Sequence, residues 1–169
     1  MGWSFTPGAS KADVIREITT NFGEPGIICL KKRVVGNVLW TLFETDRADA
    51  APERWIGCHL IEYSKWDRGY GYKGMAEDMG PYYYSCPLEY LALAPEKSAT
   101  WRAGVRAYHE SRTRVIAVGD VVTLTGCQVK SVTVTAIKPR GGALLGRAAN
   151  GTVYRIPRRL LAARTEVEA

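Results

Sequence analysis

The chain has 169 residues, of which 46% are hydrophobic and 24% are charged, and its formal net charge is +6. This composition is typical of a globular protein of one or two domains and excludes a disordered or collagen-like chain. No apolar run approaches the ~18 residues that a membrane-spanning helix needs, so we expect no membrane partner. The first residues lack the basic and apolar regions of a secretory signal, which predicts a cytoplasmic protein.

The first predicted element is an amphipathic helix that follows a capping signature. Ser10 precedes Asp13 by three residues, the spacing at which each side chain can cap the other residue's backbone. Apolar residues then repeat at intervals of four, at Val14, Ile18 and Phe22, which is the period of one helix face. The pattern predicts a single amphipathic helix.

Three β-strands are predicted next, at residues 26–35, 37–45 and 54–63. They are rich in β-branched and aromatic residues, and the first two are predicted to form a hairpin with its turn at Gly36-Asn37 or, alternatively, nearer Lys32. The third strand carries His59, one of two histidines in the chain. A histidine can act as a general base, but no orienting partner lies near this one in the sequence. We therefore interpret His59 as a packed or edge residue.

Residues 66–87, WDRGYGYKGMAEDMGPYYYSCP, are predicted to form a long loop. The segment holds six aromatic residues and four glycines, and no apolar period runs through it. Tyrosine offers a large apolar face with a polar tip, and loops of this composition often mediate recognition. The alternative is a structural cover whose tyrosines pack on the sheet. The candidate partner-binding residues are Trp66, Tyr70, Tyr72, Lys73, Glu77, Asp78, Tyr82, Tyr83 and Tyr84.

Two helices are predicted after this loop. Pro87 precedes a short helix, and Ser98 is placed to cap a longer one. On the longer helix we expect Trp101 to face the core and Arg102 to face solvent. Residues 1–112 are therefore predicted to form an α-β-β-β-α-α domain, with an antiparallel sheet and helices on one of its faces.

Residues 113–163 have a different pattern, in which short predicted strands are separated by Gly, Pro and Asn-Gly turns. Asn150-Gly151, between two of these strands, is a strong hairpin signal. The segment resembles a small SH3-like barrel, an architecture that binds nucleic acid or protein. The predicted fold class is α+β, an N-terminal antiparallel-sheet domain followed by a small C-terminal SH3-like β-barrel, with residues 164–169 as a tail.

Positive charge is concentrated in the last third of the chain. Residues 1–111 carry 13 Lys and Arg against 14 Asp and Glu, a net charge of −1. Residues 112–169 carry 10 against 3, a net charge of +7, and eight of those ten are Arg. Because Arg pairs with phosphate through two parallel hydrogen bonds, the predicted partner is nucleic acid or a nucleoprotein complex. The alternative is a solvated basic face that keeps the protein soluble. The candidate nucleic-acid-binding residues are Lys138, Arg140, Arg147, Arg155, Arg158 and Arg159.

Four cysteines are spread along the chain without a CxxC pair. Cys58, His59 and Cys86 could supply three ligands of a zinc site, but their spacing fits no finger or ribbon pattern. We interpret the cysteines as reduced thiols in an apolar core, in agreement with a cytoplasmic location. No metal site, catalytic residue or cofactor is predicted.

Three segments carry distinctive motifs: the initial MGW, the block GYGYKGMAEDMGPYYYSCP, and TWRAGVRAY. Together they resemble an uncharacterised family of small proteins carried by phages, prophages and plasmids, whose pattern is GYK-D-M-D-E-x-x-G-P followed by CP. Gly74 and Ala76 stand where the family usually has acids, which weakens any metal site built from an acidic cluster. The resemblance implies an accessory protein of a mobile genetic element in a bacterial host. The matching residues are Gly71, Tyr72, Lys73, Met75, Glu77, Gly80, Pro81, Cys86 and Pro87.

Two functions from different classes agree with these observations. The first is a non-enzymatic accessory protein that binds nucleic acid or a nucleoprotein complex. Such a protein can inhibit a host defence system, in the manner of anti-CRISPR or anti-restriction proteins, with a host defence protein as its partner. The second is an enzyme that acts on a nucleotide or nucleic-acid substrate through residues 66–87. No P-loop, HExxH, GxSxG or zinc-deaminase motif occurs, so we favour the first function.

Overall fold

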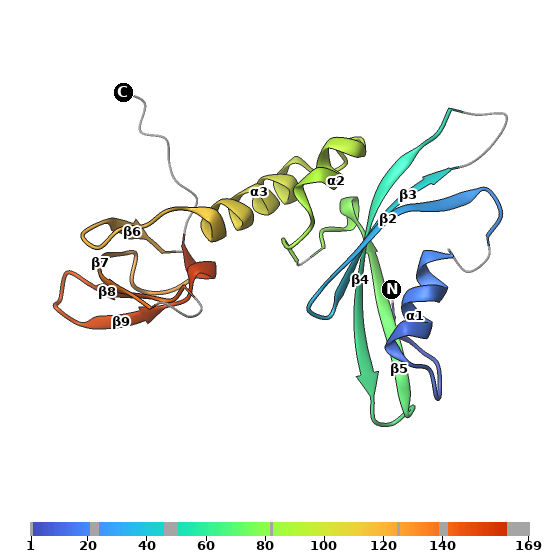
Figure 1. The fold of residues 1–169 in the computed structure, drawn as a ribbon, viewed down its shortest axis with the longest axis horizontal. Helices are drawn as coiled ribbons and strands as arrows, with labels where there is room; N and C mark the ends of the chain where they lie inside the picture. Colours follow the sequence, from blue (N-terminus) through green and yellow to red (C-terminus); the bar gives the residue numbers. More distant parts are fainter. Residues whose placement is uncertain are drawn as a thin grey trace. The chain divides into compact units, whose positions relative to one another are not determined.

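The computed structural model divides the chain into two compact units, residues 1–105 and 106–169 (Figure 1). The predicted boundary after residue 112 lies in α3 (Ala99–Thr113), a helix that begins in the first unit and ends in the second. No helix among the described residues is both long and apolar enough to cross a membrane. The structure describes residues 2–20, 24–45, 51–81, 83–124, 126–138 and 142–161, and only the backbone of Arg159.

The first unit contains a five-stranded antiparallel sheet in the order β1-β5-β4-β3-β2. The predicted hairpin is confirmed, since β2 and β3 pair across a turn in which Gly36 has a φ of +65°. Glycine adopts this left-handed conformation without the steric cost of a side chain. The third predicted strand, β4, is also confirmed. The strands are β1 (Ser4–Phe5), β2 (Ile27–Val35), β3 (Val38–Thr45), β4 (Arg54–Ser64) and β5 (Gly69–Ala76).

The strand β5 occupies the first half of the segment that the sequence pattern predicts as a loop, and this part of the prediction is wrong. β5 pairs with β4 on one side and with β1 on the other. Two of its three glycines have a packing reason, because the chain at residues 4–8 passes too close to them for any side chain. A Cβ at Gly69 would lie 2.0 Å from the carbonyl oxygen of Thr6, and one at Gly71 would lie 2.2 Å from that of Ser4.

The helix α1 (Lys11–Thr19) forms as its capping signature predicts. The Asp13 amide donates a hydrogen bond to the Ser10 hydroxyl, and the Ser10 amide donates one to the Asp13 carboxylate. These bonds satisfy amide groups that the first turn of a helix leaves unpaired. Val14 and Ile18 are buried, as the four-residue interval predicts.

Helices cover both faces of the first sheet, which corrects the prediction that they cover one face (Figure 1). α1 packs on the face that carries Leu39. α2 (Leu88–Leu93) and the start of α3 pack on the opposite face, where the rings of Trp40 and Trp101 are 5.9 Å apart. Because side chains alternate along a strand, β3 supplies apolar residues to both faces. Phe22, which the helix pattern includes, lies outside the described residues.

The second unit contains a four-stranded antiparallel sheet in the order β6-β7-β8-β9. The predicted hairpin at Asn150-Gly151 is confirmed: it joins β8 to β9, and Gly151 has a φ of +83°. One face of this sheet is buried in an apolar core of its own, which includes Val132 and Leu144. The strands are β6 (Val121–Thr123), β7 (Ser131–Ile137), β8 (Leu144–Arg147) and β9 (Val153–Ile156).

Pairing among the described residues leaves the second sheet open, with β6 and β9 at its edges, so these residues do not show the predicted SH3-like barrel. After β9 the chain forms a 3-10 turn, η3 (Arg158–Leu160). Leu161 then makes an isolated antiparallel bridge with Leu124, which follows β6. The mixture of helices with antiparallel sheets confirms the α+β class.

Candidate nucleic-acid interface

One face of the second sheet is exposed and polar, because its strands alternate between core and solvent. On β7, Val132 and Val134 are buried, whereas the hydroxyl-bearing residues that alternate with them, Ser131, Thr133 and Thr135, are exposed. No Asp or Glu occurs in β6, β7, β8 or β9. We call this surface the outer face. It consists of Val121 and Thr123 on β6, Ser131, Thr133 and Thr135 on β7, Leu145 and Arg147 on β8, and Val153 and Arg155 on β9.

Two of the predicted binding residues, Arg147 and Arg155, lie together on the outer face. Arg147 pairs with Val153 and Arg155 pairs with Leu145, so the two Arg residues are diagonal neighbours on adjacent strands. Diagonal neighbours in a sheet are about 7–8 Å apart, which is within reach of long side chains. Among the described residues, neither guanidinium has a hydrogen bond or ion pair within the protein. Both groups are therefore available to an anion.

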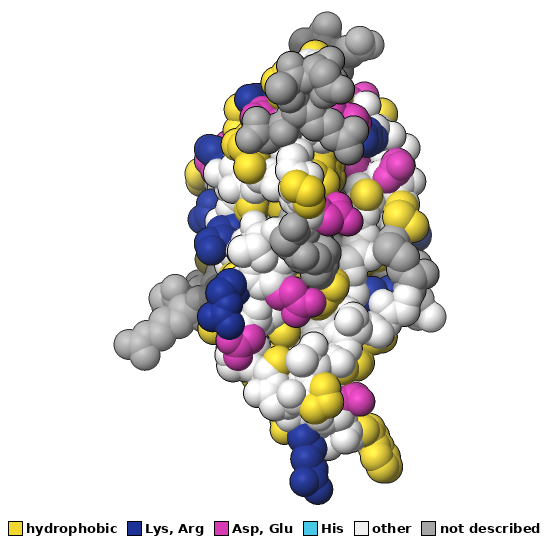
Figure 2. Space-filling model, turned by 90° about the vertical axis from the view of Figure 1, so that its right-hand side faces the viewer, with side chains coloured by type: hydrophobic (Ala, Val, Ile, Leu, Met, Phe, Trp, Pro, Cys, Tyr) yellow, Lys and Arg dark blue, Asp and Glu magenta, His cyan; other side chains and the backbone are white. Residues whose placement is uncertain are grey.

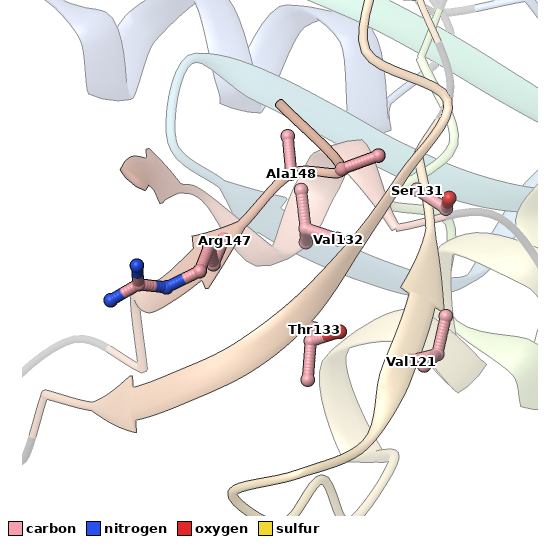
Figure 3. Close-up of a pocket in the computed structure, with 7 residues that line it drawn as sticks. Val121, Ser131, Val132, Thr133, Arg147 and Ala148 are labelled. Carbon is pink, nitrogen blue, oxygen red and sulfur yellow. The ribbon is translucent and has the colours of Figure 1, made fainter. Parts of the chain in front are cut away.

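A shallow pocket of about 210 Å³ lies on the outer face beside Arg147 (Figure 3). Val121, Thr133 and Arg147 form one row across β6, β7 and β8, because they are paired in register. Figure 3 shows the side chains of Ser131 and Thr133 on β7 with Arg147 to one side of them. Ala148 and Ala149, which follow β8, complete the lining of the pocket.

The other predicted basic residues of this unit differ in their surroundings. Lys138 is exposed just after β7. Arg158 is half-buried, and its guanidinium donates from Nε to the carbonyl of Gly142 at 3.1 Å and from Nη1 to that of Arg114 at 2.7 Å. Arg158 therefore holds two chain segments together within the unit. Arg140 and the side chain of Arg159 lie outside what the structure describes.

In the first unit, strand alternation separates the predicted partner-binding residues of β5. Tyr70 and Tyr72 are half-buried on the α1 side of the sheet. Lys73 directly follows Tyr72 on β5, so its side chain lies on the opposite face of the sheet. Trp66 is in the turn before β5, with 97% of its surface exposed. These residues do not converge on one surface.

The second half of the predicted loop is also divided between surface and interior. Asp78 is exposed, whereas Tyr83 packs against the core. Tyr84 lies over Gly104, where a Cβ would be 2.4 Å from the tyrosine ring. On the face that Figure 2 presents, hydrophobic side chains are interspersed with charged ones. Tyr82 lies outside the described residues.

Glu77 and Arg102 form a buried ion pair, although the sequence pattern predicts both at the surface. Only 3% of Glu77 and 4% of Arg102 is exposed. Arg102 Nε lies 2.6 Å from Glu77 Oε1, and Nη2 lies 2.9 Å from Oε2. A planar guanidinium makes such a two-point contact with a carboxylate. The predicted exposure of Arg102 is therefore wrong, and Glu77 lies in the interior of the first unit.

Backbone groups complete the hydrogen bonds of this ion pair. Arg102 donates to three carbonyl groups at the end of α2 and just after it. The amides of Lys97 and Ser98 donate to Glu77. Burial alone would raise the pKa of Glu77, but the bonds from Arg102 and these amides outweigh it and hold the pKa below its usual value. The pair fastens η2 (Glu77–Met79) to the segment between α2 and α3.

His59 lies on the α1 side of β4 and contacts Thr41. Its Nε2 is 3.1 Å from the Thr41 hydroxyl, and its Nδ1 is buried without a hydrogen-bond partner among the described residues. Burial disfavours the charged imidazolium and lowers the pKa of His59 to about 4. The imidazole is therefore neutral near pH 7 and packs in the core.

The residues of the conceivable zinc site lie on different faces of the first sheet. Cys58 and Cys86 are buried on the α2 side, whereas the adjacent His59 points to the α1 side. Burial raises the pKa of Cys58 to about 12 and also raises the pKa of Cys86. The thiolate is the form that binds metal, and burial opposes it. Among the described residues, no three His, Cys, Asp or Glu side chains are placed to hold a metal ion.

The hydroxyl groups of the outer face are functional candidates that our interpretation of the sequence misses. Their signal is present in the strand SVTVTAI, where Ser and Thr alternate with valine. Comparison of the chain with protein-family models, with curated proteins and with solved structures finds no match. A functional proposal therefore rests on the geometry of this face.

Proposed function

We propose that the second unit binds nucleic acid through its outer face and that the protein acts by binding rather than by catalysis. The proposal depends on one observation: Arg147 and Arg155 are neighbours on a face without acidic side chains, and neither is engaged within the described protein. Lys and Arg residues that neutralise phosphates supply most of the affinity for nucleic acid. The net charge of +7 in residues 112–169 adds a long-range attraction for a polyanion.

The surroundings of Glu77 favour binding over the enzymatic alternative. In the enzymatic alternative, Glu77 would be the carboxylate that exchanges protons with the substrate, and this role needs an accessible side chain. Glu77 is buried, and its carboxylate accepts bonds from Arg102 and from two backbone amides. Its hydrogen bonds are those of a structural group.

We also propose that the second unit is a small SH3-like barrel. The support for this is the path of the chain after β9, where η3 turns it and Leu161 bridges to Leu124 beside β6. That bridge links the two ends of the open sheet. The role of the protein in a mobile element, as an inhibitor of a host defence system, stays a prediction from the family resemblance.

The proposal can be tested by replacing both guanidinium groups without changing the size of the side chains greatly. We expect the double variant Arg147→Gln/Arg155→Gln to bind a short labelled DNA or RNA duplex about tenfold or more weakly than the wild type, because two phosphate contacts are lost. Fluorescence anisotropy at fixed ionic strength measures this affinity.

The control variant is Arg33→Gln, which removes one positive charge from an exposed position on β2 in the first unit. We expect it to bind like the wild type, because Arg33 lies outside the proposed interface. Equal affinities of wild type and double variant for every duplex and single strand tested would contradict the proposed function.

A further inference from the structure

We infer that the outer face recognises the phosphate backbone of its ligand and not the bases. This inference rests on the proposed function and specifies the class of ligand, which is any phosphodiester or polyphosphate chain regardless of base sequence. It places one phosphate group at the pocket beside Arg147 and a neighbouring phosphate at Arg155.

The outer face lacks most of the side chain types that read bases, and its Arg residues are the exception. Recognition of unpaired bases uses aromatic rings as stacking platforms, and Asn, Gln, Asp or Glu are needed to read adenine and cytosine edges, whereas Arg alone can contact guanine. The four strands carry a single aromatic residue, Tyr154, and it packs against the buried core. The face offers guanidinium groups, hydroxyl groups and aliphatic side chains.

The pocket has the donors that a phosphate requires. Ser131 and Thr133 present hydroxyl groups that make no hydrogen bond among the described residues. Thr135 differs, because its hydroxyl donates to the carbonyl of Leu145 and supports the sheet. Arg147 supplies positive charge at the rim. Hydroxyl and guanidinium groups are the side chains that most often contact phosphate oxygens in nucleic-acid complexes.

The number of charged contacts predicts how affinity depends on salt. On duplex DNA the slope of log affinity against log salt is about −0.9 for each phosphate that the protein neutralises. We expect Arg147→Gln and Arg155→Gln each to reduce the magnitude of this slope by about 0.9, by the same amount on different sequences. A contact that reads a base would instead weaken binding to one sequence more than to another.

The experiment measures full-length protein binding to a labelled GC-rich duplex and a labelled AT-rich duplex, with unlabelled inorganic polyphosphate as competitor. We expect affinities for the two duplexes within about threefold, because the phosphate spacing is common to both. Polyphosphate should displace either duplex. Ser131→Ala/Thr133→Ala should weaken binding to both duplexes and to polyphosphate by a similar factor, whereas Thr19→Ala on α1 should leave all three unchanged.

The outcomes separate this inference from the proposed function. A difference of more than tenfold between the two duplexes, or failure of polyphosphate to compete, would overturn the inference while Arg147 and Arg155 could still be shown to bind nucleic acid. Absence of binding to both duplexes and to polyphosphate would overturn the proposed function itself.

Discussion

The buried pair of Glu77 and Arg102 is the residue-scale feature on which the first unit depends most. If Glu77→Gln removes the negative charge, the guanidinium stays buried without its counter-ion. Loss of one partner of a buried ion pair costs about 3–5 kcal/mol. We expect this loss in the free energy of unfolding, measured by urea denaturation followed by tryptophan fluorescence.

The neighbouring variant Asp78→Asn is a matched control, because Asp78 is adjacent in sequence and exposed. We expect it to change stability by less than about 0.5 kcal/mol. The double variant Glu77→Leu/Arg102→Met should lose less stability than the sum of the single losses, since no charge is then left unpaired. A loss for Glu77→Gln as small as that for Asp78→Asn would show that the pair does not hold the unit together.

His59 should make the first unit less stable in mild acid. Its pKa is about 4 in the folded protein and about 6.5 in an unfolded chain, because burial disfavours the imidazolium. The unfolded state therefore binds more protons between these values, so the stabilising contribution is complete above pH ~6.5 and is lost as the pH falls toward 4. We expect a loss of about 2–3 kcal/mol across this range, measured by denaturation at a series of pH values.

The variant His59→Gln tests the origin of this pH dependence. Glutamine does not titrate, so the slope of stability between pH 4 and 6.5 should flatten. Glu77 titrates in a different range: its pKa is depressed in the folded state, so its contribution is present above the unfolded value and is lost at lower pH. A slope that His59→Gln leaves unchanged would assign the effect to another group.

At the scale of elements, the glycines of β5 hold the amino-terminal strand in place. In Gly71→Ala the new Cβ would lie 2.2 Å from the carbonyl oxygen of Ser4 and 2.3 Å from the Phe5 ring. Such overpacking costs about 1–3 kcal/mol, and moving β1 away would relieve it. We expect faster hydrogen exchange of the Thr6 amide, which donates to the carbonyl of Tyr70.

The variant Lys73→Ala is the control for this change, because Lys73 lies on the same strand and has its own side chain. It should leave exchange of the Thr6 amide unchanged. If Gly71→Ala also leaves that exchange unchanged, close packing of β1 is not the reason for glycine at this position.

The elements that the sequence predicts correctly are those determined by residues close together in the chain. The α1 capping box and the turns at Gly36 and Gly151 depend on neighbouring residues, so the sequence predicts them correctly. β5 pairs with β1, a segment far away in the sequence. Because the sequence does not show that pairing, the glycines of β5 predict a loop. The inward direction of Arg102 also depends on a distant partner, Glu77, so helix periodicity alone places it wrongly.

In the candidate site, too, local patterns are predicted correctly and contacts between distant residues are not. The alternation of Ser and Thr with Val on β7 is a local pattern that predicts one hydroxyl-bearing face. The count of charged residues alone makes Arg147, Arg155 and Arg158 equally good candidates for binding nucleic acid. Only the strand register places the first two together on the outer face, and only the contacts of Arg158 show that its guanidinium bonds to backbone carbonyls.

At the scale of the whole molecule, each unit has its own apolar core, and all five tryptophans, at positions 3, 40, 55, 66 and 101, belong to the first unit. Tryptophan emission therefore reports on that unit. Leu144 is fully buried in the second core, so Leu144→Ala should destabilise the second unit by about 2–5 kcal/mol.

We expect Leu144→Ala to lower the midpoint of part of the circular-dichroism transition and to weaken nucleic-acid binding, while the transition followed by tryptophan emission stays in place. Leu42→Ala, at an equally buried position in the first core, should lower the midpoint of the tryptophan transition and leave nucleic-acid binding unchanged. A shift of the tryptophan transition by the full amount in Leu144→Ala would mean that the two cores unfold as one. Separate transitions would instead mean that the basic sheet can be altered without loss of the first unit.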